Sequence, residues 1–126
     1  MNWKRWNLDD VEFAPMPGTP GGGIAVLVPP GGDGAWMMAV KFPPHHVVAS
    51  HWHGADAFYL VMSGEMRVGE EGTYRNGDVR WVKAGTFYGP EFVGPDGVVF
   101  LLSGHGDPAV IFDEATATSV GSIVRD

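Results

Sequence analysis

The chain has 126 residues, which is enough for one domain with a single hydrophobic core. Its apolar fraction of 44% is typical of a globular chain, and its net charge of −7 argues against nucleic acid and anionic membrane surfaces, because both bind through positive charge. The absence of cysteine excludes disulfides, thiolate zinc sites and cysteine nucleophiles.

The first segment of the chain, residues 1–23, is predicted to be an N-terminal arm. It carries Trp3 and Trp6, followed by an acidic stretch and a run rich in proline and glycine. Exposed tryptophan is costly, so we expect these side chains to pack on the domain or on a second subunit. The arm therefore predicts a homodimer. It lacks the apolar stretch of a signal peptide, and no run in the chain approaches the roughly 18 apolar residues of a membrane span, so we expect a cytoplasmic protein with no membrane partner.

Residues 24–112 are predicted to form a β-barrel. Short β-branched, aromatic or alternating segments recur between glycine and proline turn signals, and no segment shows the 3.6-residue period of a core helix. The expected strands are 24–28, 35–42, 47–53, 57–63, 65–70, 73–75, 79–83, 98–102 and 109–112. Gly64 is predicted to end one strand and to turn the chain back into the next, and Asn76-Gly77 is predicted to form a tight turn. The tail, residues 113–126, is expected to hold at most a single helical turn.

His51 and His53 are the most informative pair in the chain. Residues at i and i+2 of a strand project from the same face, so both imidazoles can point into one cavity. Neutral imidazole is the commonest protein ligand for a metal, and the pair therefore predicts a metal site.

The spacing around this pair resembles that of the cupin superfamily over about residues 35–103. His51 and His53 fill the two histidine positions of the first cupin motif, and Gly64 fills its last glycine. The glutamate position of that motif falls on Ala57, and the histidine position of the second motif falls on Tyr88. The resemblance implies an all-β fold, a cupin double-stranded β-helix (jelly-roll barrel) of two antiparallel sheets.

The resemblance also implies a site inside the barrel. His51 and His53 would bind a divalent metal ion, Fe(II) by preference and otherwise Zn, Mn or Ni. Tyr88 and Glu91 are the candidate catalytic residues, which would orient a substrate or act as acid and base. The pocket walls are expected to include four apolar and aromatic side chains: Trp36, Met38, Tyr59 and Phe100.

Three interpretations of the function stay open. The first is a small metal-dependent oxygenase, such as a dioxygenase, that acts on a small carbonyl or phenolic compound. The second is a non-catalytic cupin that binds or senses a small ligand, and the third is a metal-independent isomerase or lyase with a histidine as general base. A nucleophile elbow, a pair of inward carboxylates and a phosphate-binding glycine loop are all missing from the sequence.

Overall fold

The computed structural model describes residues 2–32 and 34–114, and the helical turn expected in the tail falls beyond them on residues 115–126. The only helical element in the described residues is a single 3₁₀ turn, η1 (Leu8–Asp10). The strands are β1 (Ala14–Pro15), β2 (Gly23–Val28), β3 (Ala35–Phe42), β4 (Val47–Val48), β5 (Trp52–His53), β6 (Ala57–Val68), β7 (Gly72–Arg75), β8 (Val79–Val82), β9 (Glu91–His105) and β10 (Val110–Ile111).

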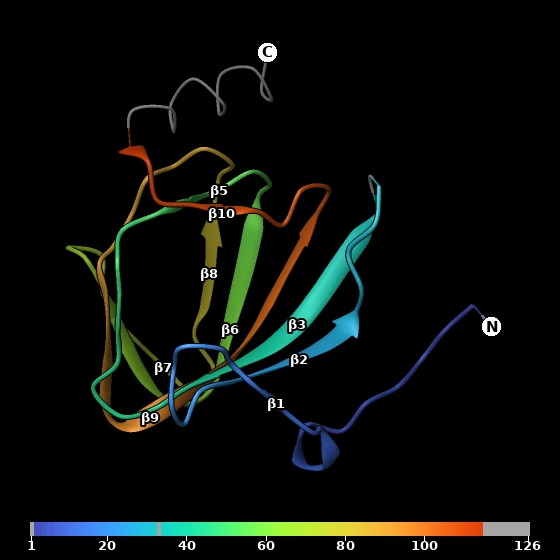
Figure 1. Ribbon diagram of the computed structural model, residues 1–126, viewed down its shortest axis with the longest axis horizontal. Helices are drawn as coiled ribbons and strands as arrows, with labels where there is room; N and C mark the ends of the chain where they lie inside the picture. The colour runs from blue at the N-terminus through green and yellow to red at the C-terminus, as the bar shows by residue number, and fades with distance from the viewer. Residues whose placement is uncertain (1, 33, 115–126) are drawn as a thin grey trace.

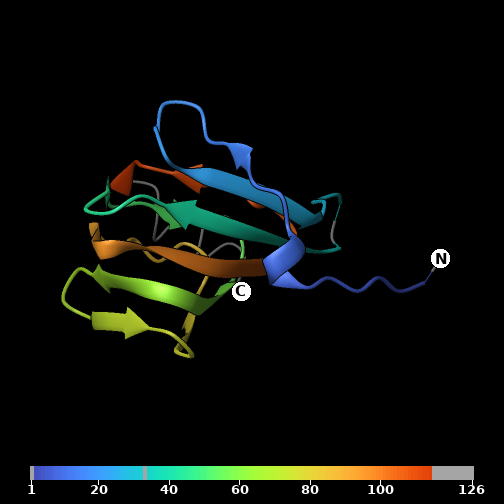
Figure 2. The ribbon, with the colours of Figure 1, turned by 90° about the horizontal axis from the view of Figure 1, so that it is seen from below.

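The strands form an eight-stranded sheet and a two-stranded sheet, and every pairing is antiparallel. The large sheet runs in the order β1-β2-β3-β9-β6-β7, with β4 paired to β9 and β8 paired to β6. The small sheet joins β5 and β10, and it lies across the upper end of the molecule in Figure 1. Figure 2 shows β2, β3, β9, β6 and β7 side by side as one strongly twisted layer. The predicted all-β architecture of two antiparallel sheets is confirmed.

The core lies between the curved sheet and the elements that close over it. Inward residues alternate with outward ones along β6, whose burial follows the two-residue period of a strand. The main cluster of buried side chains comprises Trp36, Val40, Ala57, Tyr59, Val61, Met66, Val68, Val82, Tyr88, Val93, Val98, Phe100 and Leu102. Burial of these apolar surfaces is the main stabilising contribution to the fold.

Gly64 corrects one prediction from the sequence. The chain does not turn back at this residue, because β6 continues from Ala57 to Val68 and pairs with β9 along this length, with register shifts on both sides of Gly64. Gly64 has φ +72, and a Cβ atom there would lie 1.9 Å from the carbonyl oxygen of Gly97. The glycine thus marks a bulge with close backbone approach rather than the end of a strand.

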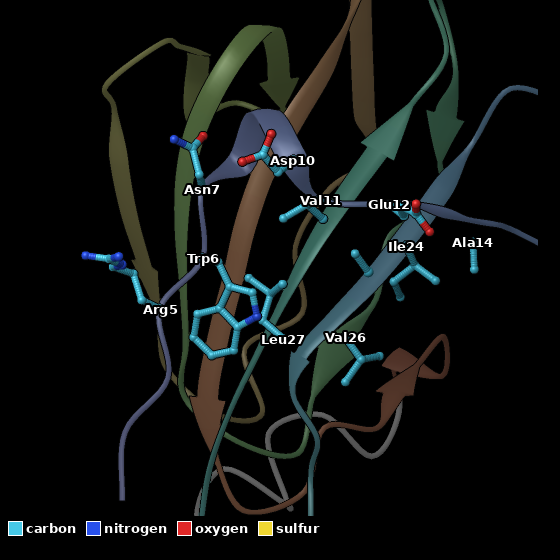
Figure 3. A pocket seen from close by; sticks show the side chains of 11 residues that line it. Arg5, Trp6, Asn7, Asp10, Val11, Glu12, Ala14, Ile24, Val26 and Leu27 are labelled. Carbon is cyan, nitrogen blue, oxygen red and sulfur yellow. The ribbon is translucent and has the colours of Figure 1, made fainter. Parts of the chain in front are cut away.

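The N-terminal arm lies against the outer side of β2. Its β1 segment pairs with the start of that strand, and Trp6 packs on a second small cluster that contains Ala25, Leu27 and Ala39. Figure 3 shows the indole of Trp6 beside Leu27. Residues of the arm and of β2 line a groove of about 570 Å³. Trp3, in contrast, is 73% exposed. The part of the chain that the structure describes contains no helix with the length and apolar character of a membrane span.

Candidate functional site

Backbone pairing aims two histidines and a tyrosine at one point inside the barrel. His51 and Tyr88 form an isolated antiparallel bridge, in which each N–H donates to the other's carbonyl at 2.9 and 3.0 Å. Side chains that lie directly opposite one another in such a pair share a face of the sheet. His53, two residues along an extended segment, projects to that same face. The two imidazole rings consequently lie 5.2 Å apart between centroids.

Four side-chain atoms meet at this point. The hydroxyl oxygen of Tyr88 lies 2.9 Å from Nε2 of His51 and 2.8 Å from Nε2 of His53. The hydroxyl oxygen of Tyr59, on β6, lies 3.1 Å from Nε2 of His53 and is in direct contact with the hydroxyl of Tyr88. We call these two imidazole nitrogens and two phenol oxygens the His–Tyr cluster. All four residues are buried.

The His–Tyr cluster has fewer protons than contacts. The Nδ1–H of His51 donates to the carbonyl of Ala49 at 2.7 Å, so Nε2 of the neutral ring carries a lone pair. Each phenol has one proton, and His53 adds a third only when its own proton is on Nε2. At most three of the four contacts are therefore hydrogen bonds. In addition, Nδ1 of His53 is buried and has no hydrogen-bond partner among the described residues.

Arg80 is a buried cation directly behind the two tyrosines. It lies opposite Tyr59 in the β6–β8 pairing, so it points into the barrel, whereas its neighbours Val79 and Trp81 are exposed. Its guanidinium carbon lies 4.2 Å from the ring centroid of Tyr88 and 5.1 Å from that of Tyr59. Two hydrogen bonds of 2.7 Å to the carboxylate of Glu71 hold the guanidinium in place.

Both histidines are neutral at physiological pH. Burial lowers the pKa of His51, and the nearby charge of Arg80 lowers it further against the opposing effect of its hydrogen bond to Ala49. Burial also lowers the pKa of His53, to about 4, with smaller contributions from His51 and Arg80. Neutral imidazole presents a lone pair and is therefore the form that binds a metal.

Glu91, the first residue of β9, brings a carboxyl group to the same place. It is 2% exposed, and its Oε1 lies 3.7 Å from Nε2 of His51. Burial raises the pKa of Glu91 to about 7, although the positive charge of Arg80 opposes the rise. Because His51 is neutral, this contact is not an ion pair. Glu91 is poised to hold or release a proton near neutral pH.

His51, His53 and Tyr59 of the His–Tyr cluster line an apolar cavity of about 340 Å³. His51, His53, Tyr59 and Glu91 supply the polar part of its wall. The rest of the wall is almost wholly apolar and comes from the arm and from β2, β3, β4, β9, β10 and the segments that flank them: Met16, Ile24, Met38, Val40, Phe42, His46, Val48, Phe100, Leu102, Val110 and Phe112. An apolar cavity with a small set of polar side chains in its wall fits a small, mainly apolar molecule that carries a polar group.

The structure brings most of the residues singled out in the sequence to this cavity. His51, His53, Glu91, Met38, Tyr59 and Phe100 line it, and Tyr88 reaches the His–Tyr cluster. Trp36 is placed elsewhere: it is 1% exposed in the core, and its ring fills the space beside Gly104. The sequence analysis did not single out Arg80, because an arginine side chain on a strand usually faces solvent. The available signal was its alternation with Val79 and Trp81, which puts Arg80 on the face opposite to both.

The two histidines fit a metal ion. Among the described residues, no three side chains of histidine, cysteine, aspartate or glutamate are grouped as metal ligands, so these two would need other partners. The hydrogen bond from Nδ1 of His51 to a backbone carbonyl is the outer-shell contact that orients a metal-binding histidine. Three of the contacts, at 2.8–3.1 Å, match the spacing of about 2.9 Å between adjacent ligands of an octahedral ion that lie about 2.0–2.1 Å from it, whereas the two phenol oxygens lie closer together than that.

Comparison with known proteins identifies the fold and the family. The family profile described as the ChrR cupin-like domain matches residues 4–106. The anti-sigma factor ChrR of Rhodobacter sphaeroides, solved in complex with SigE, is 24% identical, with a TM-score of 0.63. The match covers 78% of this chain and 51% of that one, so this chain spans about half the length of that protein. The polyketide cyclase RemF of Streptomyces resistomycificus is 21% identical, with a TM-score of 0.67 over 93% of both chains.

A third solved structure is a proposed acetylacetone dioxygenase of Methylibium petroleiphilum. It is 22% identical, with a TM-score of 0.66 over 94% of both chains. No curated protein matches the chain. Similarity at this level of identity shows the fold, and the cupin architecture implied by the histidine and glycine spacing is thereby confirmed.

Proposed function

The chain belongs to the ChrR cupin-like domain family, and from this premise we propose that it is a metal-dependent cupin enzyme, an oxygenase of a small carbonyl or phenolic compound. The single observation that carries the proposal is the position of the His–Tyr cluster. Its nitrogen and oxygen atoms converge beside the polar side chains that line an otherwise largely apolar cavity. Such a cavity holds a small apolar compound and keeps its oxygen function beside the ion.

Each part of the site has a separate task in this proposal. His51 and His53 hold the ion, and bound iron would supply Lewis acidity and redox chemistry toward oxygen. The apolar wall, which includes Met38 and Phe100, binds the body of the compound and excludes water. Glu91 accepts or returns a proton on the oxygen function, because its pKa of about 7 lets the carboxyl exchange a proton near neutral pH.

A second candidate function is a non-catalytic cupin that binds or senses a small ligand. Its supporting observation is that the hydroxyl of Tyr88 lies within hydrogen-bond distance of both Nε2 atoms, so the protein's own groups engage the histidines. The third interpretation, a metal-independent isomerase or lyase, is less favoured. A pKa of about 4 makes His53 a weak general base at neutral pH.

Oxygen consumption by the iron-loaded protein tests the proposal. Protein purified without a histidine tag is stripped with a chelator, loaded with iron and mixed with a panel of small β-diketones and catechols at an oxygen electrode. We expect oxygen uptake that requires both iron and one class of compound. His51→Ala and His53→Ala should abolish it, whereas His105→Ala, at an exposed position at the end of β9, should leave it unchanged.

Calorimetry on the same compounds separates the two candidates. Compounds that bind in the micromolar range but produce no oxygen uptake with iron would refute the oxygenase and favour the ligand-binding module. Oxygen uptake that survives in both histidine variants would refute the proposed site. We also propose that the protein acts in the cytoplasm as a homodimer, with the N-terminal arm in the interface.

A further inference from the structure

Two histidines alone hold a metal ion weakly, and a stable site requires further protein ligands. The atoms nearest to the two Nε2 nitrogens are the hydroxyl oxygens of Tyr88 and Tyr59, at 2.8–3.1 Å. The carboxyl of Glu91 is farther away, with its closer approach to His51 at 3.7 Å. The tyrosines, rather than a carboxylate, therefore occupy the positions next to the histidines.

We propose that Tyr59 and Tyr88 bind the metal as phenolates beside His51 and His53, and that this donor set selects a trivalent ion such as Fe(III). The inference rests on the proposed metal dependence and deepens it by naming the ligands and the charge of the ion. The trivalent ion differs from the Fe(II) that the sequence predicts. Tyr59, which the sequence places in the pocket wall, becomes a metal ligand in this proposal.

The proton count of the His–Tyr cluster supports direct ligation. Four atoms share four contacts but at most three protons, and Nε2 of His51 has no proton to give because Nδ1–H donates to Ala49. A cation among these atoms accepts a lone pair from each of them and removes the shortage. On binding, two phenol O–H bonds break and two metal–oxygen bonds form. Two protons pass to the solvent, and the oxidation state of the metal does not change.

Arg80 is the independent observation that favours phenolates. A buried guanidinium over the faces of both phenol rings, at 4.2 and 5.1 Å, stabilises negative charge on those rings. Glu71 accepts hydrogen bonds from Nε and Nη2 of this guanidinium. Its Nη1 is buried and has no hydrogen-bond partner in the part of the chain that the structure describes. A cation over a ring face is also attracted to a neutral phenol, but it stabilises a phenolate more strongly because that ring carries negative charge.

The choice of a trivalent ion follows from acidity and charge. A phenol has a pKa of about 10 in water, and burial raises the pKa of both Tyr59 and Tyr88 further. A metal must therefore be strongly acidic to displace these protons at neutral pH, and the displacement grows with the charge on the ion. Tyrosine oxygen is known as a ligand of haem iron. Divalent zinc, in contrast, is typically held by imidazole, thiolate and carboxylate. The four-atom set of two imidazoles and two phenolates is thus suited to Fe(III).

The chain contains only three tyrosines, which makes a complete test possible. Chelator-stripped protein is titrated with ferric nitrilotriacetate while visible absorption and proton release in weak buffer are recorded. Phenolate ligands of ferric iron produce an intense charge-transfer band, which imidazole and carboxylate ligands do not. We expect a coloured complex and the release of about two protons per bound ion.

The three Tyr→Phe variants assign the band. Tyr59→Phe and Tyr88→Phe should each weaken or shift it and lower ferric affinity by on the order of tenfold or more, and the double variant should be colourless. Tyr74→Phe is the matched control and should keep the full band, because the Tyr74 hydroxyl donates to Glu71 outside the His–Tyr cluster. Circular dichroism shows that each variant is folded.

The outcomes separate this inference from the proposed function. Ferric iron that binds without a visible band, or zinc that binds equally well to the wild type and to the folded double variant, overturns tyrosine ligation and leaves metal dependence standing. No binding of Fe(III), Fe(II) or Zn(II) by the wild type overturns both. A band that is retained in the folded double variant also refutes the assignment.

Discussion

Glu91→Gln is expected to make the metal-free protein more stable at pH 8 and to have little effect near pH 4.5. Burial raises the pKa of Glu91 from 4.5 to about 7 in the folded protein. Between these values the folded chain holds a proton that the unfolded chain has released, so stability falls as the pH rises through this window. Above pH 7 the buried carboxylate is ionised, and the full penalty is present.

The magnitude follows from the size of the shift. A rise of about 2.5 pH units at about 1.36 kcal/mol per unit amounts to roughly 3 kcal/mol. Glutamine has nearly the same shape as glutamic acid but no charge, so Glu91→Gln removes this penalty. The free energy of unfolding of the variant should exceed that of the wild type by up to about 3 kcal/mol at pH 8, and by close to nothing near pH 4.5.

Urea denaturation of chelator-treated protein between pH 4.5 and pH 8 provides the measurement. The difference between variant and wild type at each pH is needed, because His51 and His53 change protonation over part of the same range. Glu65→Gln is the matched control, since Glu65 is 40% exposed and lies 3.8 Å from Arg75, which is 65% exposed. A difference for Glu91→Gln that is constant with pH, or that falls as pH rises, would refute the reasoning.

Three further predictions concern the scaffold. Gly64→Ala should lower the free energy of unfolding in urea by about 3 kcal/mol or more, because the new Cβ would lie 1.9 Å from a carbonyl oxygen. The control Gly77→Ala, at a residue with φ +91 and open space around it, should lower it by about 1 kcal/mol, and equal losses would contradict this reasoning. Arg80→Lys should cost about 2 kcal/mol in the same assay, because lysine cannot make the two-pronged contact to Glu71, and an unchanged stability would count against it. Removal of residues 1–12 should shift the protein from dimer to monomer in analytical ultracentrifugation, and an intact chain that sediments as a monomer at tens of micromolar would exclude the proposed dimer.

The sequence predicts the fold class and the histidine pair because both depend on local signals. The two-residue period places His51 and His53 on one face whatever the rest of the chain does. Glycine and proline mark turns through their own backbone preferences, as at Asn76-Gly77, where the turn forms as predicted. His45 adopts φ +62, in the left-handed region that histidine tolerates better than most residues.

The parts that the sequence does not predict depend on contacts between distant strands. Gly64 has the composition of a turn, and only its pairing with β9 near Gly97 reveals a bulge in a continuous strand. The inward position of Arg80 likewise depends on the register that places it opposite Tyr59. Such registers are set by packing across the whole sheet, and a shift of one residue would reverse every side chain of a strand.

The same register explains how a buried polar cluster can exist inside a small barrel. His51 is paired with Tyr88 through the backbone, and Tyr59 is paired with Arg80, so each polar side chain enters the core together with a partner. His53 and Tyr59 come from β5 and β6, and His51 and Tyr88 come from the segments before β5 and β9, whereas β3 and the centre of β9 supply apolar wall residues. In the proposed function, the residues that would bind an ion and those that would select a compound by shape therefore lie on different strands. We expect that a change of wall residue on β3 alters which compound fits without moving the atoms that would hold the ion.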